Sequence, residues 1–126
     1  MPTYNVVADY IVVLDLNTTP KLGDPKTLTF SAGGSSLRTS ERGIVQFTMN
    51  CLPQDDTMTA LDVSLNGRSL IEVFSLVKGP VQSLHAVIPG GLLANSNNKL
   101  VFTVTSGNGI LSINNVVVWV QVQSGS

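Results

Sequence analysis

The sequence predicts an all-β protein, an antiparallel β-sandwich of about eight strands. Apolar and polar residues alternate with a period of two along most of the chain, as on strands with one face in a core and the other in water. Turn residues recur at intervals of about 8–12 residues, the spacing typical of sandwiches and barrels. No segment sustains the 3.6-residue period of a helix, so the strands are expected to pair antiparallel.

Four strands are expected in the first half of the chain. Each is β-branched and apolar or alternates between apolar and polar residues, and each is expected on that composition. These strands are Tyr10 to Leu16, Thr27 to Ser31, Gly43 to Cys51 and Leu61 to Leu65. In the third of them, Val45, Phe47, Met49 and Cys51 share one face, and Ile44, Gln46, Thr48 and Asn50 share the other.

Four further strands are expected in the second half. They are Leu70 to Val77, Ser83 to Ile88, Lys99 to Ser106 and Ile113 to Gln123. The last has a clear division between its faces, with the valines at even positions on one side. The other side holds Val117, Trp119, Gln121 and Gln123.

Length and charge limit the classes of protein that fit. A chain of 126 residues is one domain by typical sizes, and 43% hydrophobic residues are enough to bury a core. The net charge is −1, and the seven Lys and Arg residues are scattered singly. Nucleic-acid binders cluster basic side chains to neutralise phosphates. We therefore expect a single domain over residues 1–126 and no nucleic-acid partner.

The sequence also predicts a soluble chain without a membrane partner. The amino terminus lacks the basic stretch and apolar segment of a signal peptide, and no apolar run approaches the roughly 20 residues that span a bilayer. The single cysteine, Cys51, excludes an internal disulfide and a Cys-based zinc site, and its apolar flanks favour a buried, inert thiol.

A series of short motifs follows in a fixed order between residues 61 and 122. They are Asn66-Gly67 after a strand, Ile88-Pro89, Gly91-Leu92-Leu93, Asn97-Asn98 before Leu100-Val101-Phe102, and Ile113 to Val116. This order resembles the carboxy-terminal half of galactose-binding-like jelly rolls, the fold of many carbohydrate-binding modules and accessory domains of glycosidases. The resemblance implies a jelly-roll topology and a carbohydrate partner.

No catalytic constellation is evident. The only histidine, His85, lies in a strand and is interpreted first as a surface residue, and no Gly-x-Ser-x-Gly motif is present. Glycoside hydrolysis needs two carboxylates on either side of one bond, and the one adjacent acidic pair, Asp55-Asp56, fits a plain loop. The sequence therefore predicts that the protein is not an enzyme.

No cofactor is expected, with one alternative. Jelly rolls of the resembled kind often hold a structural calcium ion, which takes oxygen ligands. No EF-hand spacing is present. If such an ion is bound, its ligands are expected among the loop acids Asp15, Asp24, Asp55 and Asp56.

Sugar sites usually combine an aromatic platform with polar side chains that bind hydroxyls. The one tryptophan, Trp119, fits either the edge of the core, which is the favoured interpretation, or an exposed sheet face; Tyr4 and Tyr10 are weaker candidates. The loop from Gly33 to Gly43 is the longest polar, Gly-rich segment, and such loops often hold functional residues. The candidate ligand-binding residues are Arg38, Glu41, Arg42, His85, Asn108 and Trp119.

Two hypotheses of different classes follow. The first is a non-catalytic carbohydrate-binding module or small lectin, favoured by the resemblance, the polar uncharged composition and the missing catalytic groups. The second is a structural or assembly module whose valine-rich sheet face, with Val117 and Trp119 on its outer side, pairs with a second copy or docks a protein partner.

Overall fold

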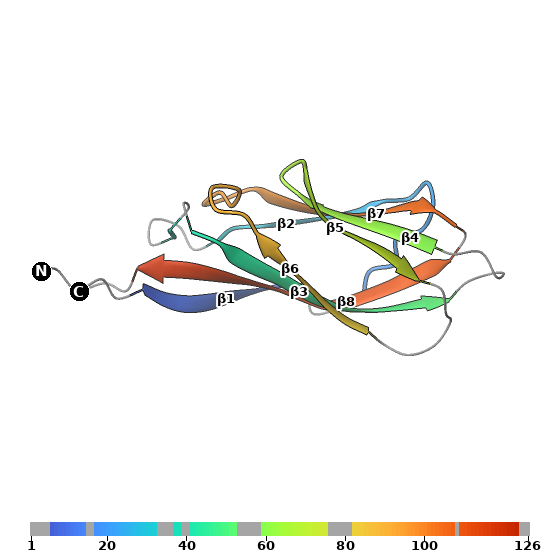
Figure 1. Cartoon of the computed structure of the whole chain (residues 1–126), viewed down its shortest axis with the longest axis horizontal. Coiled ribbons are helices and arrows are strands. Elements are labelled where there is room, and N and C mark those ends of the chain that lie inside the picture. The colour runs from blue at the N-terminus through green and yellow to red at the C-terminus, as the bar shows by residue number, and fades with distance from the viewer. Residues whose placement is uncertain are drawn as a thin grey trace, which may run out of the picture.

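The protein is a sandwich of two four-stranded antiparallel sheets (Figure 1). The computed structural model describes residues 6–14, 17–32, 37–38, 41–52, 59–75, 82–107 and 109–123. Its strands are β1 (Val6–Leu14), β2 (Lys26–Phe30), β3 (Gly43–Leu52), β4 (Thr59–Leu65), β5 (Arg68–Ser75), β6 (Gln82–Ile88), β7 (Asn98–Ser106) and β8 (Ile110–Gln123). None of these described residues forms a helix long and apolar enough to cross a membrane. The predicted all-β class and the eight strands are confirmed.

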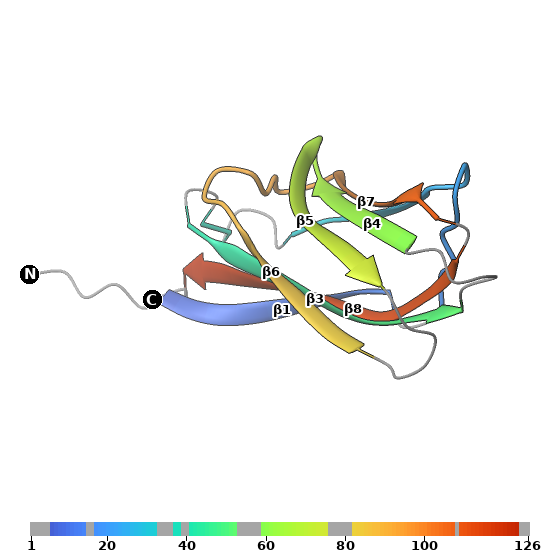
Figure 2. The ribbon, with the colours of Figure 1, turned by 45° about the vertical axis from the view of Figure 1, so that its right-hand side comes forward.

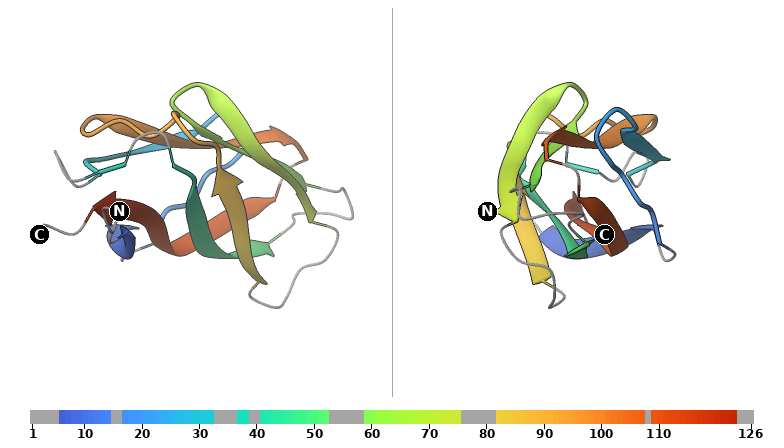
Figure 3. Two further views of the ribbon diagram at one scale, coloured as in Figure 1. Left: turned by 60° about the vertical axis from the view of Figure 1, so that its left-hand side comes forward. Right: turned by 90° about the vertical axis from the view of Figure 1, so that its right-hand side faces the viewer.

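The order of the strands is that of a jelly roll. One sheet has the order β1-β8-β3-β6 and the other β2-β7-β4-β5. Of the seven connections between consecutive strands, only the one from β4 to β5 stays within a sheet, and every other one crosses to the opposite sheet. Figure 2 and the end-on view of Figure 3 show the two layers that result. The predicted jelly-roll topology is therefore confirmed.

The core lies between the inner faces of the two sheets, and alternation along the strands fills it. On β3 the buried residues include Val45, Phe47 and Met49, and on β7 they include Leu100, Phe102 and Val104. The rings of Phe47 and Phe102 meet edge to face across the sandwich, with centroids 5.4 Å apart. The even-numbered valines of β8 are also buried, as the pattern of that strand predicts.

The hairpin between β4 and β5 turns on Asn66 and Gly67. Their φ values are 52° and 87°, the left-handed geometry of the two-residue turn that fits the twist of paired strands. Two hydrogen bonds between Asn66 and Lys99 tie the turn to β7. Asn66 N donates to Lys99 O, and Lys99 N donates to Asn66 Oδ1, both at 2.9 Å. Asn66 Nδ2 also donates to Leu92 O at 2.9 Å. The turn therefore holds a neighbouring strand as well as its own.

Asn98 is a fully buried polar side chain beneath this hairpin, with an exposed fraction of 0%. Its Oδ1 accepts from Ala94 N at 2.8 Å and from Asn66 Nδ2 at 3.0 Å. Its Nδ2 donates to Ala94 O at 2.8 Å and to Phe30 O at 3.3 Å. One amide thus joins β2, the β4–β5 hairpin and the loop before β7, and the two donors and the acceptor of that amide are satisfied.

Replacing this amide should lower stability markedly. In an Asn98→Leu variant the buried carbonyl of Phe30 loses its bond to the Asn98 side chain, while the part-buried backbone groups of Ala94 can turn to water instead. One buried polar group without a partner costs about 1–3 kcal/mol, and we expect the free energy of unfolding, measured in urea, to fall by about that amount. The control, Ser96→Ala in the same loop, changes an exposed residue and should stay within about 0.5 kcal/mol of the parent. Equal stability of Asn98→Leu and parent would contradict this role.

Candidate functional site

The outward side of the β1-β8-β3-β6 sheet, here called the outer face, holds an exposed row of apolar side chains. Tyr10 pairs with Trp119, Trp119 with Ile44, and Ile44 with Val87, so one residue from each strand lies in the row. Their exposed fractions are 57%, 38%, 40% and 54%. Four large apolar side chains therefore cross the full width of the sheet in contact with solvent. We call these four residues the apolar row.

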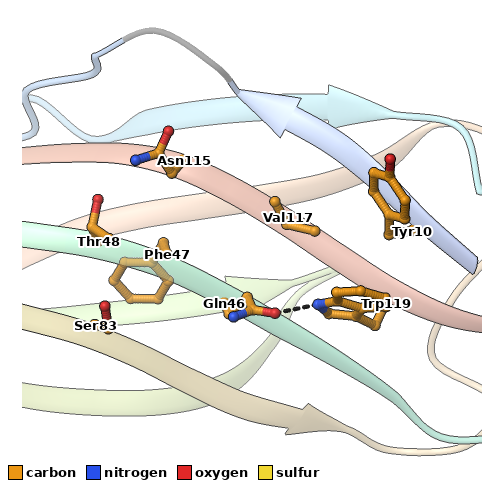
Figure 4. A pocket seen from close by; sticks show the side chains of 8 residues that line it. All are labelled: Tyr10, Gln46, Phe47, Thr48, Ser83, Asn115, Val117 and Trp119. Atoms are coloured by element: carbon orange, nitrogen blue, oxygen red, sulfur yellow. Dashed lines mark hydrogen bonds between the residues drawn. The ribbon is translucent and has the colours of Figure 1, made fainter.

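Two aromatic rings of this row form a pair. The centroids of Tyr10 and Trp119 are 5.4 Å apart, and their planes are tilted by 47°. Trp119 Nε1 donates a hydrogen bond to Gln46 Oε1 on the neighbouring strand, as Figure 4 shows. This bond satisfies the polar atom of the indole and fixes the ring on the sheet surface. The favoured interpretation of Trp119 as a residue at the edge of the core is therefore wrong, because its side chain lies on the outer face.

A hollow of about 380 Å³ lies beside this aromatic pair. Residues of β3, β6 and β8 line it, together with Tyr10 of β1 (Figure 4). The lining residues are Tyr10, Gln46, Phe47, Thr48, Ser83, Asn115, Val117 and Trp119. The side chains of Thr48, Ser83 and Val117 are small, and the open space above them is the hollow that lies beside the rings of Tyr10 and Trp119. The hollow thus combines an aromatic wall with hydroxyl and amide groups.

A β-bulge in β8 shapes the hollow. Gln46 of β3 pairs with Val117, but Thr48 pairs with Asn114, so β8 advances by three residues where β3 advances by two. Asn115, at the bulge, has a φ of 53°, a left-handed conformation that Asn tolerates better than most residues. Thr48 Oγ1 donates to Asn114 O at 3.1 Å and so links β3 to the bulged strand.

The bulge also resets which side chains of β8 point outward. Before it, Leu111 and Ile113 are buried, whereas after it Val116 and Val118 are buried. The buried positions change from odd to even numbers, because one extra residue reverses the two-residue period. Trp119 faces solvent for this reason.

A second, smaller hollow lies on the other side of Trp119. Its volume is about 140 Å³, and its lining residues are Arg42, Gly43, Ile44, Trp119, Val120 and Gln121. Gln121 Nε2 donates to the backbone oxygen of Arg42 at 3.0 Å, which ties the start of β3 to the end of β8. Trp119 therefore lines both hollows.

The structure brings some of the predicted site residues together. Arg42 and Trp119 line the second hollow, and His85 is exposed on β6 opposite Gln46, on the outer face. Arg38 and Glu41 form an ion pair at 3.5 Å, and Arg38 N donates to Gln121 O at 3.0 Å, so both lie beside the end of β8. That these residues bind a ligand stays a prediction.

The sixth candidate, Asn108, lies outside the described residues, as does most of the loop between 33 and 40. The predicted calcium ligands Asp15, Asp55 and Asp56 lie outside them too, and Asp24 forms an ion pair with Lys26 at 3.1 Å. In the part of the chain that the structure describes, no group of three or more His, Cys, Asp or Glu side chains converges. The expected absence of a cofactor and the calcium alternative both stay predictions.

Four polar residues of the larger hollow, Gln46, Thr48, Ser83 and Asn115, were not among the predicted site residues. The alternation of β3 does place Gln46 and Thr48 opposite the core side. What the pattern lacks is the order of strands, which sets β8 between β1 and β3 and brings Trp119 to Gln46. The consecutive Asn114 and Asn115 within a run of valines are the one sequence signal for the bulge.

The close approach of β3 to β8 at Trp119 depends on Gly43. A methyl group on Gly43 would lie 2.7 Å from the Trp119 carbonyl oxygen and 3.3 Å from Leu93 Cδ1. Because the nearest atom belongs to the backbone, a Gly43→Ala variant must push the two strands apart. We expect the free energy of unfolding to fall by about 1–3 kcal/mol and the fluorescence of Trp119, the only tryptophan, to shift. Ser83→Ala, on the same face, is the control and should retain the parent spectrum; an unchanged spectrum for Gly43→Ala would refute the close contact.

Comparison with known proteins identifies the fold but no sequence family. No protein-family model matches the chain, and no curated protein matches it in sequence. Among solved structures, dimeric latent PorU from Porphyromonas gingivalis superposes with a TM-score of 0.70 and 14% identity, over 95% of this chain and 13% of that one. The C-terminal domain of EclA, a sugar-binding protein, superposes with a TM-score of 0.55 and 10% identity, over 94% of this chain and 81% of that one. The chain thus spans a small part of PorU, and at these identities the likenesses show a shared β-sandwich fold.

Proposed function

We propose that this protein is a non-catalytic carbohydrate-binding module that binds sugar on the outer face around Trp119. The observation that carries the proposal is the exposed Tyr10–Trp119 pair beside a hollow of about 380 Å³. Exposed aromatic rings at a hollow are costly to leave in water and suit a ligand with an apolar face. A pyranose ring has such a face, formed by its C–H groups.

The polar residues of the hollow suit the rest of a sugar. The Ser83 hydroxyl can donate and accept, and the amide of Asn115 has two N–H donors and a carbonyl acceptor. The Thr48 hydroxyl donates to Asn114 O and offers its lone pairs as an acceptor, and Gln46, whose carbonyl accepts from Trp119, offers its N–H donors. Sugar hydroxyls need both kinds of partner, and a site that supplies them rejects analogues without those hydroxyls. Gln46 also holds the indole of Trp119, so it acts as a positioning residue for the platform.

Two further observations support the proposal. The EclA C-terminal domain, which has a similar fold, is described as a sugar-binding protein. A β-sandwich of this kind can therefore support sugar binding. Among the described residues that line the two hollows there is no carboxylate. Glycoside hydrolysis by the usual pair of carboxylates therefore has no support on this face, and binding without catalysis fits it better.

The test is a loss of binding when the platform is removed. The parent would be screened on a glycan array, and the oligosaccharides retained there would be titrated calorimetrically against the parent and against Trp119→Ala and Tyr10→Ala. Because large aromatic contacts often dominate an interface, we expect Trp119→Ala to weaken binding at least about tenfold and Tyr10→Ala to weaken it less.

The matched control is Leu22→Ala, which removes another exposed apolar side chain outside both hollows and should bind like the parent. Each variant would be checked for folding by its urea transition. No glycan bound by the parent at millimolar concentration, or equal loss in all three variants, would refute the proposal.

A second candidate function is assembly through the same sheet. The apolar row crosses all four strands, and Val12, which is 54% exposed, extends it on β1. An exposed apolar patch of this kind marks an interaction surface, and a second copy of the chain is the partner that this candidate names.

Sedimentation velocity over a range of micromolar concentrations tests this candidate. If the apolar row is a self-association surface, the parent should form dimers, and Val87→Lys should shift the equilibrium to monomers because a desolvated ammonium group is costly to bury. Val87 lines neither hollow, so the same variant should keep its sugar binding. A parent that stays monomeric removes this candidate and leaves the sugar-binding proposal standing.

A further inference from the structure

The two hollows on either side of Trp119 differ in charge. The larger one is lined by uncharged residues, whereas the smaller one includes the guanidinium-bearing Arg42. Of all the described residues that line either hollow, Arg42 is the one with a formal charge. A ligand that occupies both hollows therefore meets an uncharged half and a cationic end.

We propose that the two hollows form one binding track along β8, which takes an oligosaccharide with an anionic group, a carboxylate or a sulfate ester, over Arg42. This inference rests on the proposed function and names the class of sugar that the site prefers. The track is defined by the lining residues from Asn115 to Gln121 on β8 and their neighbours on β3.

The length of the track argues for more than one sugar residue. At about 3.3 Å per residue, the six steps from Asn115 to Gln121 span roughly 20 Å. That is longer than a single pyranose ring, and Trp119 lies between the two ends, four positions from Asn115 and two from Gln121. Figure 4 shows the part of the track from Asn115 to Trp119. One ring stacked on Trp119 leaves room for a neighbour on each side, in the two hollows that the indole borders.

The surroundings of Arg42 leave its charge available to a ligand. Among the described residues the ion pairs are Lys26–Asp24 and Arg38–Glu41, and Arg42 takes part in neither. The neighbouring carboxylate of Glu41 is engaged by Arg38 at 3.5 Å, which offsets its charge. The hydrogen bond from Gln121 Nε2 to the Arg42 carbonyl fixes the backbone of Arg42 at the edge of the smaller hollow.

A guanidinium is well suited to this role. Its planar group of N–H donors matches the oxygen pairs of a carboxylate or sulfate, and such charge-assisted bonds are among the stronger hydrogen bonds. Because Arg42 is exposed, water and salt screen the interaction, so the expected preference is modest and should decrease as ionic strength rises.

The experiment compares ligands that differ in charge alone. Tetrasaccharides of galacturonic acid and of glucuronic acid would be titrated beside their methyl esters, and a sulfated galactan fragment beside its desulfated form. For the parent we expect the acidic member of at least one pair to bind about fivefold more tightly at low salt, with the difference shrinking at high salt. The carboxylate and sulfate arms show which anionic group Arg42 receives.

Arg42→Gln should lower the affinity for the acidic ligand far more than the affinity for its neutral partner, so the ratio of the two affinities should fall to about one. The matched control is Arg68→Gln, an exposed arginine on the other sheet, which should keep the parent's preference. A length series supplies the second readout: the tetrasaccharide should bind several-fold more tightly than the monosaccharide of the same sugar.

The outcomes separate this inference from the proposed function. If neutral and acidic ligands bind the parent equally and lose affinity together in Trp119→Ala, the anionic preference is wrong and the sugar site stands. If monosaccharide and tetrasaccharide bind equally, the extended track is wrong. If none of these ligands nor any on the array binds the parent, the inference and the proposed function fail together.

Discussion

The structure depends on which side chains of β8 face the core and which face solvent. This strand lies between β1 and β3, so it must fill the core with one set of side chains while its other set covers the middle of the outer face. A strict two-residue period cannot keep Ile113 and Val118 both inside, because they lie five positions apart. The extra residue at Asn114–Asn115 reconciles them, and in doing so it turns Trp119 toward solvent.

The same strand explains why the candidate site is on a sheet. Binding residues often lie on loops held by a rigid scaffold, and the loop from Gly33 to Gly43 fits that expectation by its composition. Instead, the described part of the site is built from side chains on four paired strands, with Gln46 holding Trp119 in place. Strand pairing on both sides of β8 fixes the backbone beneath these side chains, so a ligand at the proposed site would meet a platform that needs little ordering.

Much of the fold was predictable because it follows from local rules. The alternation of β3 and β7 predicted their buried faces, and Asn66-Gly67 predicted a tight hairpin that the positive φ values confirm. The candidate site was harder, because its residues meet only through sheet order. Nothing local to Tyr10 says that it pairs with Trp119, more than 100 positions away. The sequence favours the edge of the core for Trp119, which is wrong. A two-residue period separates the two faces of a strand, but it does not say which face is buried.

The hairpin at Asn66 has a consequence for the chemical stability of the chain, because an Asn-Gly pair is prone to deamidation. An asparagine followed by glycine is open to attack on its side-chain carbon by the glycine's own backbone nitrogen, which expels ammonia and, after hydrolysis of the ring, leaves an acid in place of the amide. In the folded chain both ends of that amide are occupied, by Lys99 N and by Leu92 O, so the side chain must leave its partners before it can react. If the change does occur, a carboxylate oxygen replaces the N–H donor that faces Leu92 O and Asn98 Oδ1, and three acceptors then meet without a proton between them. Folding thus shields the amide that ties the hairpin to β7, and the reaction is expected to run faster in a chain that is unfolded.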